Sequence, residues 1–344
     1  MFLKTPWLFP LLTLLLGAFL AWVLLAPRAS NPSSNPPILS PQIKPSPNSN
    51  QTANAPGFLL IRGAFVIVGK QPDGDSVRFV ADNTSLFGQL KNNSRVRLSK
   101  DNSVQLRFEA IDAPELHYLG AAQPMGSESR DALLKLMGFK DPQFRNDGAT
   151  VTSASVQTVR GAILSNAAEV NGRPISYVLL ENDAKNLTDG TRIKVTDAIL
   201  QKTLNAKQLL NGMAYLTVYS STPESHRSFL RGLTVQARAS KLGVWARDAS
   251  ANFKLVNKDS VNERGALILP KLFRRAISYL NAKAKNDNLG SIKDWMISTQ
   301  TTGVSEDDLV RINLQTVRLS SLLNVAGNQV KFAPDTTGLV FVEK

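Results

Sequence analysis

The sequence predicts an α+β fold: a small five-stranded Greek-key β-barrel with three packed helices, followed by a small α/β C-terminal extension. Two observations support this prediction. Short segments rich in branched and aromatic residues dominate the first part of the folded chain, and segments with helical spacing of apolar residues enter late. The length of 344 residues is typical of about two domains.

The first 27 residues have the composition of a signal sequence or a membrane anchor. Lys4 precedes an apolar run from Trp7 to Leu25, and no charge occurs from Thr5 to Pro27. The run is long for a signal core and no clear cleavage site follows it, so we favour an uncleaved anchor. Both alternatives predict an extracytoplasmic location, membrane-anchored or secreted, for the rest of the chain.

Residues 28 to 56 are rich in proline, serine and asparagine and contain almost no large apolar residue. Such a segment buries too little surface to offset the entropy lost on ordering, so we expect an extended tether. The first folded domain is therefore expected to begin near Gly57 and to cover residues 57 to 248.

Five segments are expected to form the strands of the barrel. The first two flank an Asp-Gly turn and predict a hairpin. The segments are Phe58 to Val68, Ser76 to Val80, Val104 to Ile111, Val156 to Leu164 and Ile175 to Leu180. Five strands with late helices agree with the Greek-key barrel called the OB-fold.

Three helices are expected in the same domain, each marked by a cap or a stop signal. Their apolar stripes are assigned to packing rather than to function. The first is capped by Ser127 and stops at Gly138, the second runs from Leu200 to Gly212, and the third begins at Thr222-Pro223 and runs toward Gly243.

Residues 249 to 344 form an extension whose function the sequence does not reveal. A helix is expected from Pro270 to Lys285, and short strands at Val310 to Leu314, Val330 to Phe332 and Leu339 to Val342. The helix is amphipathic and basic, which suits contact with nucleic acid, with a membrane or with its own strands, and we favour packing on the strands. Its basic residues are Lys271, Arg274, Arg275 and Lys283.

The charge balance favours a polyanionic partner such as nucleic acid. The net charge is +13 and the pI is about 10, although a generic basic surface would give the same balance. The chain has no cysteine, which excludes disulfides and thiolate metal sites, and only two histidines, His117 and His226. Any metal would therefore be held by oxygen ligands, and we assign His117 no role.

Three short segments contain residues that suggest chemistry. They are Asp73-Gly74-Asp75-Ser76, Arg107 to Glu115, and Asn171 to Tyr177. Each segment alone is more often only a turn or a strand end than part of a catalytic site. Together, in a β context, they suggest a pocket in which carboxylates hold a hard cation and arginines hold a phosphate, as needed to cleave a phosphodiester.

These segments resemble the motifs of the staphylococcal nuclease (thermonuclease-like) family. The family pattern is Asp-Gly-Asp-Thr, then an arginine followed by Asp-x-Pro-Glu, then Gly-Arg before an apolar strand. The resemblance covers about residues 57 to 248 and implies an OB-fold. Further landmarks in the expected order are Gln123 to Gly126, Leu204-Asn205, Gly212 to Ala214 and Lys241 to Trp245.

The resemblance implies a calcium site. The ligands would be the carboxylates of Asp75 and Asp112 and the backbone carbonyl of Ala113, oxygen donors of the kind that calcium takes in proteins. Ala113 stands where the family has threonine, which keeps the carbonyl and loses only a side chain.

The resemblance also implies the residues that act on substrate. Glu115 would be the general base that activates water, and Arg107 and Arg173 would clamp the phosphate through paired hydrogen bonds. Tyr215 and Tyr219 are candidates for stacking on a base.

The expected function is therefore a calcium-dependent, sequence-nonspecific nuclease acting on DNA and RNA. Two alternatives stay open: a non-catalytic nucleic-acid-binding module on the same barrel, and an envelope-associated interaction protein in which residues 249 to 344 dominate. Asn171 replaces an aromatic residue of the family, and the segment Glu181 to Ile199 is longer than usual, so base preference and mode of cleavage stay open. The sequence does not indicate an oligomeric state.

Overall fold

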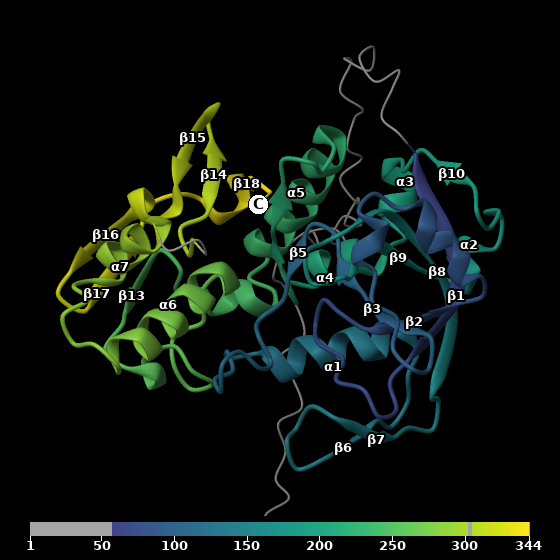
Figure 1. Ribbon diagram of the computed structural model, residues 1–344, viewed down its shortest axis with the longest axis horizontal. Coiled ribbons are helices and arrows are strands. Elements are labelled where there is room, and N and C mark those ends of the chain that lie inside the picture. The colour runs from purple at the N-terminus through teal and green to yellow at the C-terminus, as the bar shows by residue number, and fades with distance from the viewer. Residues whose placement is uncertain (1–56, 302–304, 344) are drawn as a thin grey trace, which may run out of the picture. The chain divides into compact units, whose positions relative to one another are not determined.

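The computed structural model describes residues 57–301 and 305–343, whose arrangement is shown in Figure 1. The predicted anchor at residues 1–27 and the predicted tether at residues 28–56 lie outside the described residues. Within the part of the chain that is described, no helix is both long and apolar enough to cross a membrane.

The first part of the described chain forms a strongly curled half-barrel sheet within a mixed α+β fold. The strand order is β3-β2-β1-β8-β9-β4, with β10 also pairing with β1. Neighbours are antiparallel except β4 and β9, which are parallel. The strands are β1 (Phe58–Val66), β2 (Arg78–Ala81), β3 (Ser103–Gln105), β4 (Arg107–Phe108), β8 (Thr158–Ala168), β9 (Pro174–Leu180) and β10 (Arg192–Ile193).

Two glycines opposite each other help the sheet to curl. Gly63 of β1 pairs with Gly161 of β8, and a Cβ on either would lie 2.2 or 2.3 Å from a neighbouring carbonyl oxygen. The rings of Phe65 and Phe79, 5.2 Å apart, cover the two glycines. The missing side chains therefore allow a close approach of strands that other residues would prevent.

The sheet has seven strands, so the expected count of five is not confirmed. The predicted strand from Val104 to Ile111 is divided because it changes partner: β3 pairs with β2, whereas β4 pairs with β9. Ala110 then adopts a left-handed conformation (φ +66°), and the chain continues as β5 (Ile111–Asp112), which pairs with β11 (Tyr215–Leu216). The expected hairpin of β1 and β2 is confirmed.

The three expected helices are present, with changed boundaries. The first begins at Gly126 after Met125, not at a Ser127 cap, and it ends at Gly138 (φ +91°) as predicted. The second is divided in two. The helices before residue 248 are α1 (Gly126–Met137), α2 (Glu181–Ala184), α3 (Asp197–Leu200), α4 (Leu204–Leu210) and α5 (Glu224–Ala239).

The C-terminal segment, residues 249–343, contributes most of a second core, to which Tyr215 and Trp245 of the first part of the chain also belong. β12 (Val218–Tyr219), which precedes this segment, pairs in parallel with β18 (Val340–Phe341). The sheets are ordered β12-β18-β14-β15 and β13-β17-β16. The other elements are β13 (Asn252–Lys254), α6 (Pro270–Lys283), α7 (Ile292–Ser298), β14 (Leu309–Ile312), β15 (Gln315–Arg318), β16 (Leu323–Ala326) and β17 (Gln329–Phe332).

The helix α6 packs inside this second core, as we expected. Phe273 and Ile277 are fully buried there with Phe341 of β18. In Figure 1 the C-terminal elements, coloured yellow-green to yellow, form a group beside α5. The described residues belong to one compact unit.

Candidate active site

The Asp73-Gly74-Asp75 turn is held tightly between helices. A Cβ on Gly74 would lie 2.1 Å from Oγ of Ser129 in α1, so no larger residue fits there. From α4, Gln208 donates from Nε2 to the Gly74 carbonyl at 2.9 Å. These contacts hold the backbone of the turn that carries Asp75, a residue that is 6% exposed.

The second segment is held by one asparagine of α4. Asn205 donates from Nδ2 to the carbonyls of Glu109 and Ser176, at 2.9 and 3.0 Å, and its Oδ1 accepts from the Val178 N–H at 3.0 Å. This side chain joins β9 to the turn at Ala110. The chain therefore enters β5 in the direction that brings Asp112 toward Asp75.

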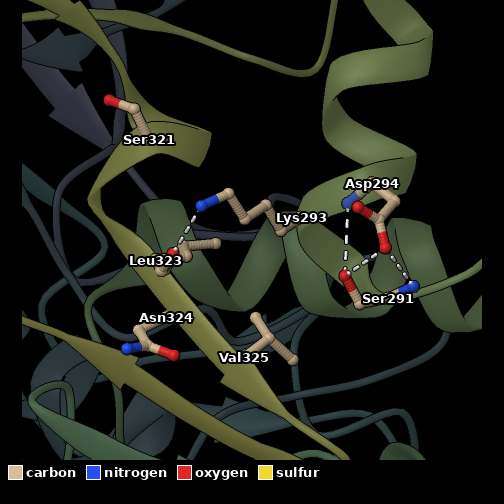
Figure 2. Close-up of a pocket in the computed structure, with 7 residues that line it drawn as sticks. All are labelled: Ser291, Lys293, Asp294, Ser321, Leu323, Asn324 and Val325. Carbon is tan, nitrogen blue, oxygen red and sulfur yellow. Dashed lines mark hydrogen bonds between the residues drawn. The ribbon is translucent and has the colours of Figure 1, made fainter.

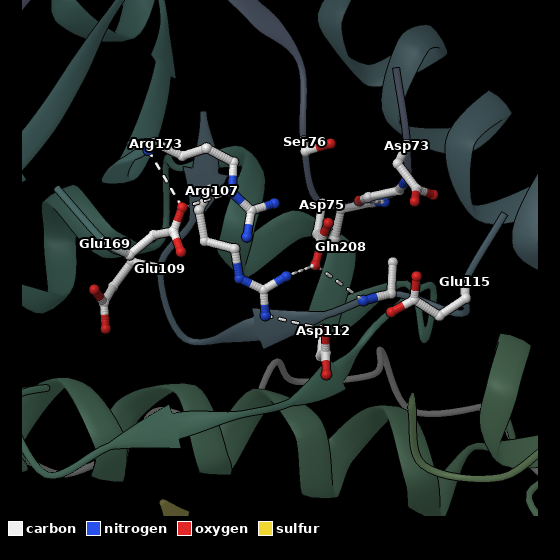
Figure 3. Close-up of polar contacts among 12 residues, drawn as sticks. Asp73, Asp75, Ser76, Arg107, Glu109, Asp112, Glu115, Glu169, Arg173 and Gln208 are labelled. Atoms are coloured by element: carbon white, nitrogen blue, oxygen red, sulfur yellow. Dashed lines mark hydrogen bonds and ion pairs between the residues drawn. The ribbon is translucent and has the colours of Figure 1, made fainter. Parts of the chain in front are cut away.

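Arg107 connects the two aspartates that we predicted to share a site. Its Nη1 donates to Oδ2 of Asp75 at 2.6 Å and its Nη2 donates to Oδ1 of Asp112 at 3.0 Å (Figure 3). The N–H of Ala113 lies 3.4 Å from the same Asp75 oxygen. The structure thus brings Asp75, Arg107, Asp112 and Ala113 together, although Arg107 is bound to carboxylates rather than left open for a phosphate.

Arg173 lies beside this group, as the third segment predicted. Its Nε donates to Oε1 of Glu169 at 2.9 Å, and its side chain is 31% exposed. Asn171 donates to the other Glu169 oxygen at 2.9 Å. Figure 3 shows the Arg173 and Arg107 guanidinium groups in the same region next to Asp75. Burial raises the pKa of Asp75, and the positive charges of Arg107 and Arg173 oppose that rise.

A further residue lies in the site: Arg274 of α6. Its Nη2 donates to Oδ2 of Asp112 at 2.6 Å, and its Nη1 lies 3.2 Å from Oδ1. The same Nη1 donates to Oε1 of Glu115. Arg274 is 162 residues from Asp112 along the chain, and no local pattern in the sequence separates it from the other basic residues of its helix.

The charges of this cluster affect its acids differently. Burial of Asp112 opposes its ionisation, but the Arg274 and Arg107 guanidinium groups outweigh burial and hold its pKa below the ordinary value of 3.8. Burial raises the pKa of Glu115, and the Arg274 charge offsets only part of that rise. Burial also raises the pKa of Asp73, with the charges of Asp75 and Glu115 adding to the rise.

The donor chemistry fits a hard cation, but both carboxylate ligands already accept hydrogen bonds from arginine: Asp75 from Arg107, and Asp112 from Arg107 and Arg274. Asp75 and Asp112 supply carboxylate oxygens of the kind that calcium binds. Both oxygens of Asp112 accept from guanidinium groups, and Arg274 stands where a cation would neutralise Asp112 and Glu115. Among the described residues, no group of three or more His, Cys, Asp or Glu side chains is arranged to hold a metal ion. Calcium would therefore fit only after Arg274 moved away from Asp112, and it would share the Asp75 and Asp112 carboxylates with Arg107.

The two predicted stacking residues differ in burial: Tyr215 is buried and Tyr219 is half-buried. Tyr215 is 0% exposed and its hydroxyl donates to Oδ1 of Asp248 at 2.9 Å, so its ring offers no face to a base and we remove it from the candidate site. The ring of Tyr219 is half-buried, 6.0 Å from that of Phe341 and 5.2 Å from Nζ of Lys271. A role for Tyr219 in stacking stays a prediction.

A separate surface cavity of about 560 Å³ lies in the C-terminal segment between α7 and β16 (Figure 2). Its polar groups are used in local structure: Lys293 donates to the Leu323 carbonyl at 3.1 Å, and Ser291 and Asp294 cap α7. None of the predicted site residues lines this cavity. We therefore place the candidate active site at the carboxylate cluster instead.

No protein-family model matches the sequence, and no curated protein matches it.

Proposed function

We propose that this protein is a metal-dependent phosphodiesterase that cleaves DNA and RNA without marked sequence preference. The observation that best supports this proposal is the convergence of Asp75, Asp112 and Glu115 around arginine side chains in one largely buried site. Structural ion-pair networks also contain such residues, but a carboxylate with a raised pKa beside clustered arginines is typical of catalytic sites.

The side chains of this site suit phosphodiester hydrolysis. The reaction needs a nucleophile generated next to the ester and positive charge on the phosphoryl oxygens as negative charge develops there. Glu115 would accept the proton of the attacking water, a role favoured by its raised pKa because a base acts best with a pKa near the working pH. Arg107 and Arg173 would donate hydrogen bonds to the phosphoryl oxygens.

A calcium ion on Asp75 and Asp112, with the Ala113 carbonyl, would add Lewis acidity next to the phosphate. The chain's own contribution is to position these oxygens. The turn at Gly74 and the side-chain bridges from Gln208 and Asn205 hold the two loops in a single geometry, so little reorganisation would accompany the reaction.

We also propose an OB-like barrel and an extracytoplasmic location. The antiparallel succession β3-β2-β1-β8-β9, extended by parallel pairing of β9 with β4 into a strongly curled half-barrel, is consistent with such a barrel. The location rests on the apolar run from Trp7 to Leu25, which also suggests contact with a membrane.

One observation favours a second candidate, a nucleic-acid-binding module without catalytic activity. Arg274 neutralises Asp112 and Glu115, the proposed ligand and the proposed base, as it would in a purely structural ion cluster. The net charge of +13 suits nucleic acid in both cases. The two candidates differ only in whether nucleic acid is cleaved.

The test is degradation of plasmid DNA and of single-stranded RNA by the full chain, with calcium and with chelator. Asp82→Asn is a matched control for Asp75→Asn, because Asp82 is half-exposed and pairs with Arg160 outside the site. We expect degradation that needs calcium, survives in the control and is lost in Asp75→Asn. Binding of nucleic acid without cleavage in calcium would refute the proposal and support the second candidate.

A further inference from the structure

We propose that Arg274 is an internal competitor for the divalent cation, so that α6 holds the candidate active site in a latent state. This inference rests on the proposed function, because it takes Asp112 as a ligand and Glu115 as the base. It assigns the C-terminal segment a role that its own sequence does not suggest: control of a site built by the first part of the chain.

Arg274 engages both the proposed metal ligand, Asp112, and the proposed general base, Glu115. It donates to both oxygens of Asp112 and also to Oε1 of Glu115. Bidentate pairs between arginine and carboxylate are among the stronger hydrogen-bonded contacts in proteins. While this arrangement lasts, Asp112 cannot direct those lone pairs at a cation, and Glu115 has one oxygen engaged instead of free to accept a proton from water.

Because both are positively charged, the Arg274 guanidinium and a calcium ion cannot occupy the Asp112 carboxylate at the same time. The carboxylates of Asp75, Asp112 and Glu115 are compensated by the guanidinium groups of Arg107 and Arg274. A calcium ion placed on the Asp112 oxygens would meet the Arg274 guanidinium at contact distance, and like charges repel strongly in a site with little water. Binding of the cation therefore requires Arg274 to leave.

The helix that carries Arg274 is firmly anchored. Phe273 and Ile277 are fully buried in the second core, and Arg275 donates to Oδ2 of Asp308 at 2.7 Å. Lys271 is also largely buried, with Nζ 4.7 Å from the centre of the Phe341 ring. The basic residues of α6 thus make internal contacts, and Arg274 is directed at the carboxylates by the packing of its neighbours.

The loop after Glu115 is tied to the same segment. Gln123 accepts from the Glu115 N–H at 3.1 Å and donates to the Ile268 carbonyl, just before α6, at 2.7 Å. The hydroxyl of Tyr118 lies 3.0 Å from Oγ of Ser278 in α6. The base and its blocking arginine are therefore held in a common framework, and this framework does not depend on the Arg274 side chain.

It follows that a rotation of the Arg274 side chain is enough to release Asp112 and Glu115 from Arg274, while Arg107 keeps its contacts with Asp75 and Asp112. The backbone of α6 stays in place because its anchors are on other residues, and the side chain is 17% exposed, so one side of it reaches the surface. Calcium at sufficient concentration, or an anionic phosphate that attracts the guanidinium, would shift the site from the latent to the open state.

The first experiment measures calcium binding to the full chain by isothermal titration calorimetry. We compare the parent with Arg274→Gln and with Lys285→Gln, which removes one charge at an exposed position just after α6. Arg274→Gln should bind calcium at least about tenfold more tightly than the parent. In the parent, calcium must first break the hydrogen bonds from Arg274 to the Asp112 and Glu115 carboxylates, and hydrogen bonds to charged groups are stronger than neutral ones. Lys285→Gln should match the parent. Equal affinity in all three would overturn the proposal.

A second measurement covers the case in which Arg274→Gln does not fold because Asp112 and Glu115 lose the positive charge of Arg274. Arg274→Lys keeps the charge but loses the bidentate contact, so the site should still fold. Calcium should raise the Tm of Arg274→Lys by more than it raises the Tm of the parent. An equal rise, or no rise in either protein, contradicts the competition.

Plasmid cleavage by the same proteins separates this inference from the proposed function. If the parent cleaves with calcium and every variant binds calcium equally, only the competition fails. If no protein binds calcium and none cleaves, both fail, and the cluster is a structural ion network.

Discussion

The guanidinium group of Arg274 donates from Nη2 to Oδ2 of Asp112 at 2.6 Å, across 162 residues of chain. This contact joins the C-terminal segment to a carboxylate that is 1% exposed. The candidate site therefore consists of two aspartates, a glutamate and three arginines drawn from both parts of the chain, not of three segments of one domain.

Replacing the proposed base should separate chemistry from binding. Glu115→Gln keeps the size and hydrogen-bonding capacity of the side chain but cannot accept the proton of water. We expect turnover to fall by a factor on the order of 100 to 10,000, the usual range for general-base catalysis, with nucleic-acid affinity largely kept. Single-turnover cleavage and fluorescence anisotropy measure the two quantities. Glu128→Gln, on the exposed face of α1, is the control, and a loss of affinity equal to the loss of rate would mean that Glu115 organises the loop instead.

The role of Asp75 as a calcium ligand can be tested by measuring calcium binding, with no measurement of cleavage. Asp75→Asn preserves the shape of the buried side chain and removes the charge that would attract calcium. Calorimetry should show that calcium binding is lost in Asp75→Asn when the substitution is made together with Arg274→Gln, and kept in Arg274→Gln alone. Unchanged calcium binding in the double variant would place the metal elsewhere.

If Arg107 and Arg173 bind the phosphate through paired hydrogen bonds, activity should depend strongly on arginine at position 173. Lysine keeps the positive charge but cannot donate two parallel hydrogen bonds to a phosphate. We expect Arg173→Lys to lower turnover by at least about tenfold. The loss should approach the one seen when a hydrogen-bond donor to the negative charge of the transition state is removed from an enzyme. Arg160→Lys, which changes a half-exposed arginine paired with Asp82, should be as active as the parent. Full activity in Arg173→Lys would make Arg173 a surface arginine that only pairs with Glu169.

The pH dependence of cleavage should reflect the environment of Glu115. Burial raises its pKa above the ordinary 4.5, and the base must be ionised to act, so kcat/KM should fall as pH drops through this raised value. Arg274 lowers the same pKa. Removing it in Arg274→Gln should therefore move the acid limb of the profile to higher pH, and an acid limb at the same pH in parent and variant would show that Glu115 is not the titrating base.

Much of the fold was predictable because its signals are local. The hairpin of β1 and β2 follows from branched residues on both sides of an Asp-Gly turn. The end of α1 follows from Gly138, which adopts the left-handed conformation that glycine favours. Such features depend on residues near one another in the sequence.

The features that were missed depend on long-range partners. The chain from Ser103 to Asp112 forms three short strands because each pairs with a different neighbour, and apolar alternation alone does not contain that information. Tyr215 was assigned to stacking by resemblance, but it is the partner of Asp112 in the ladder of β11 and β5 and is buried by the second core. Arg274 could not be singled out because α6 reads as an ordinary basic amphipathic helix.

The most direct measurement of the central claim is the rate of plasmid cleavage by the Arg274→Gln variant of the full chain as calcium is increased. In this variant the competing guanidinium is gone, so any catalytic capacity of the carboxylate cluster is exposed. We predict a cleavage rate that rises and saturates with calcium and is lost when Glu115→Gln is added. A folded Arg274→Gln variant that binds nucleic acid but cleaves none at any calcium concentration would contradict the account and identify the protein as a non-catalytic binding module.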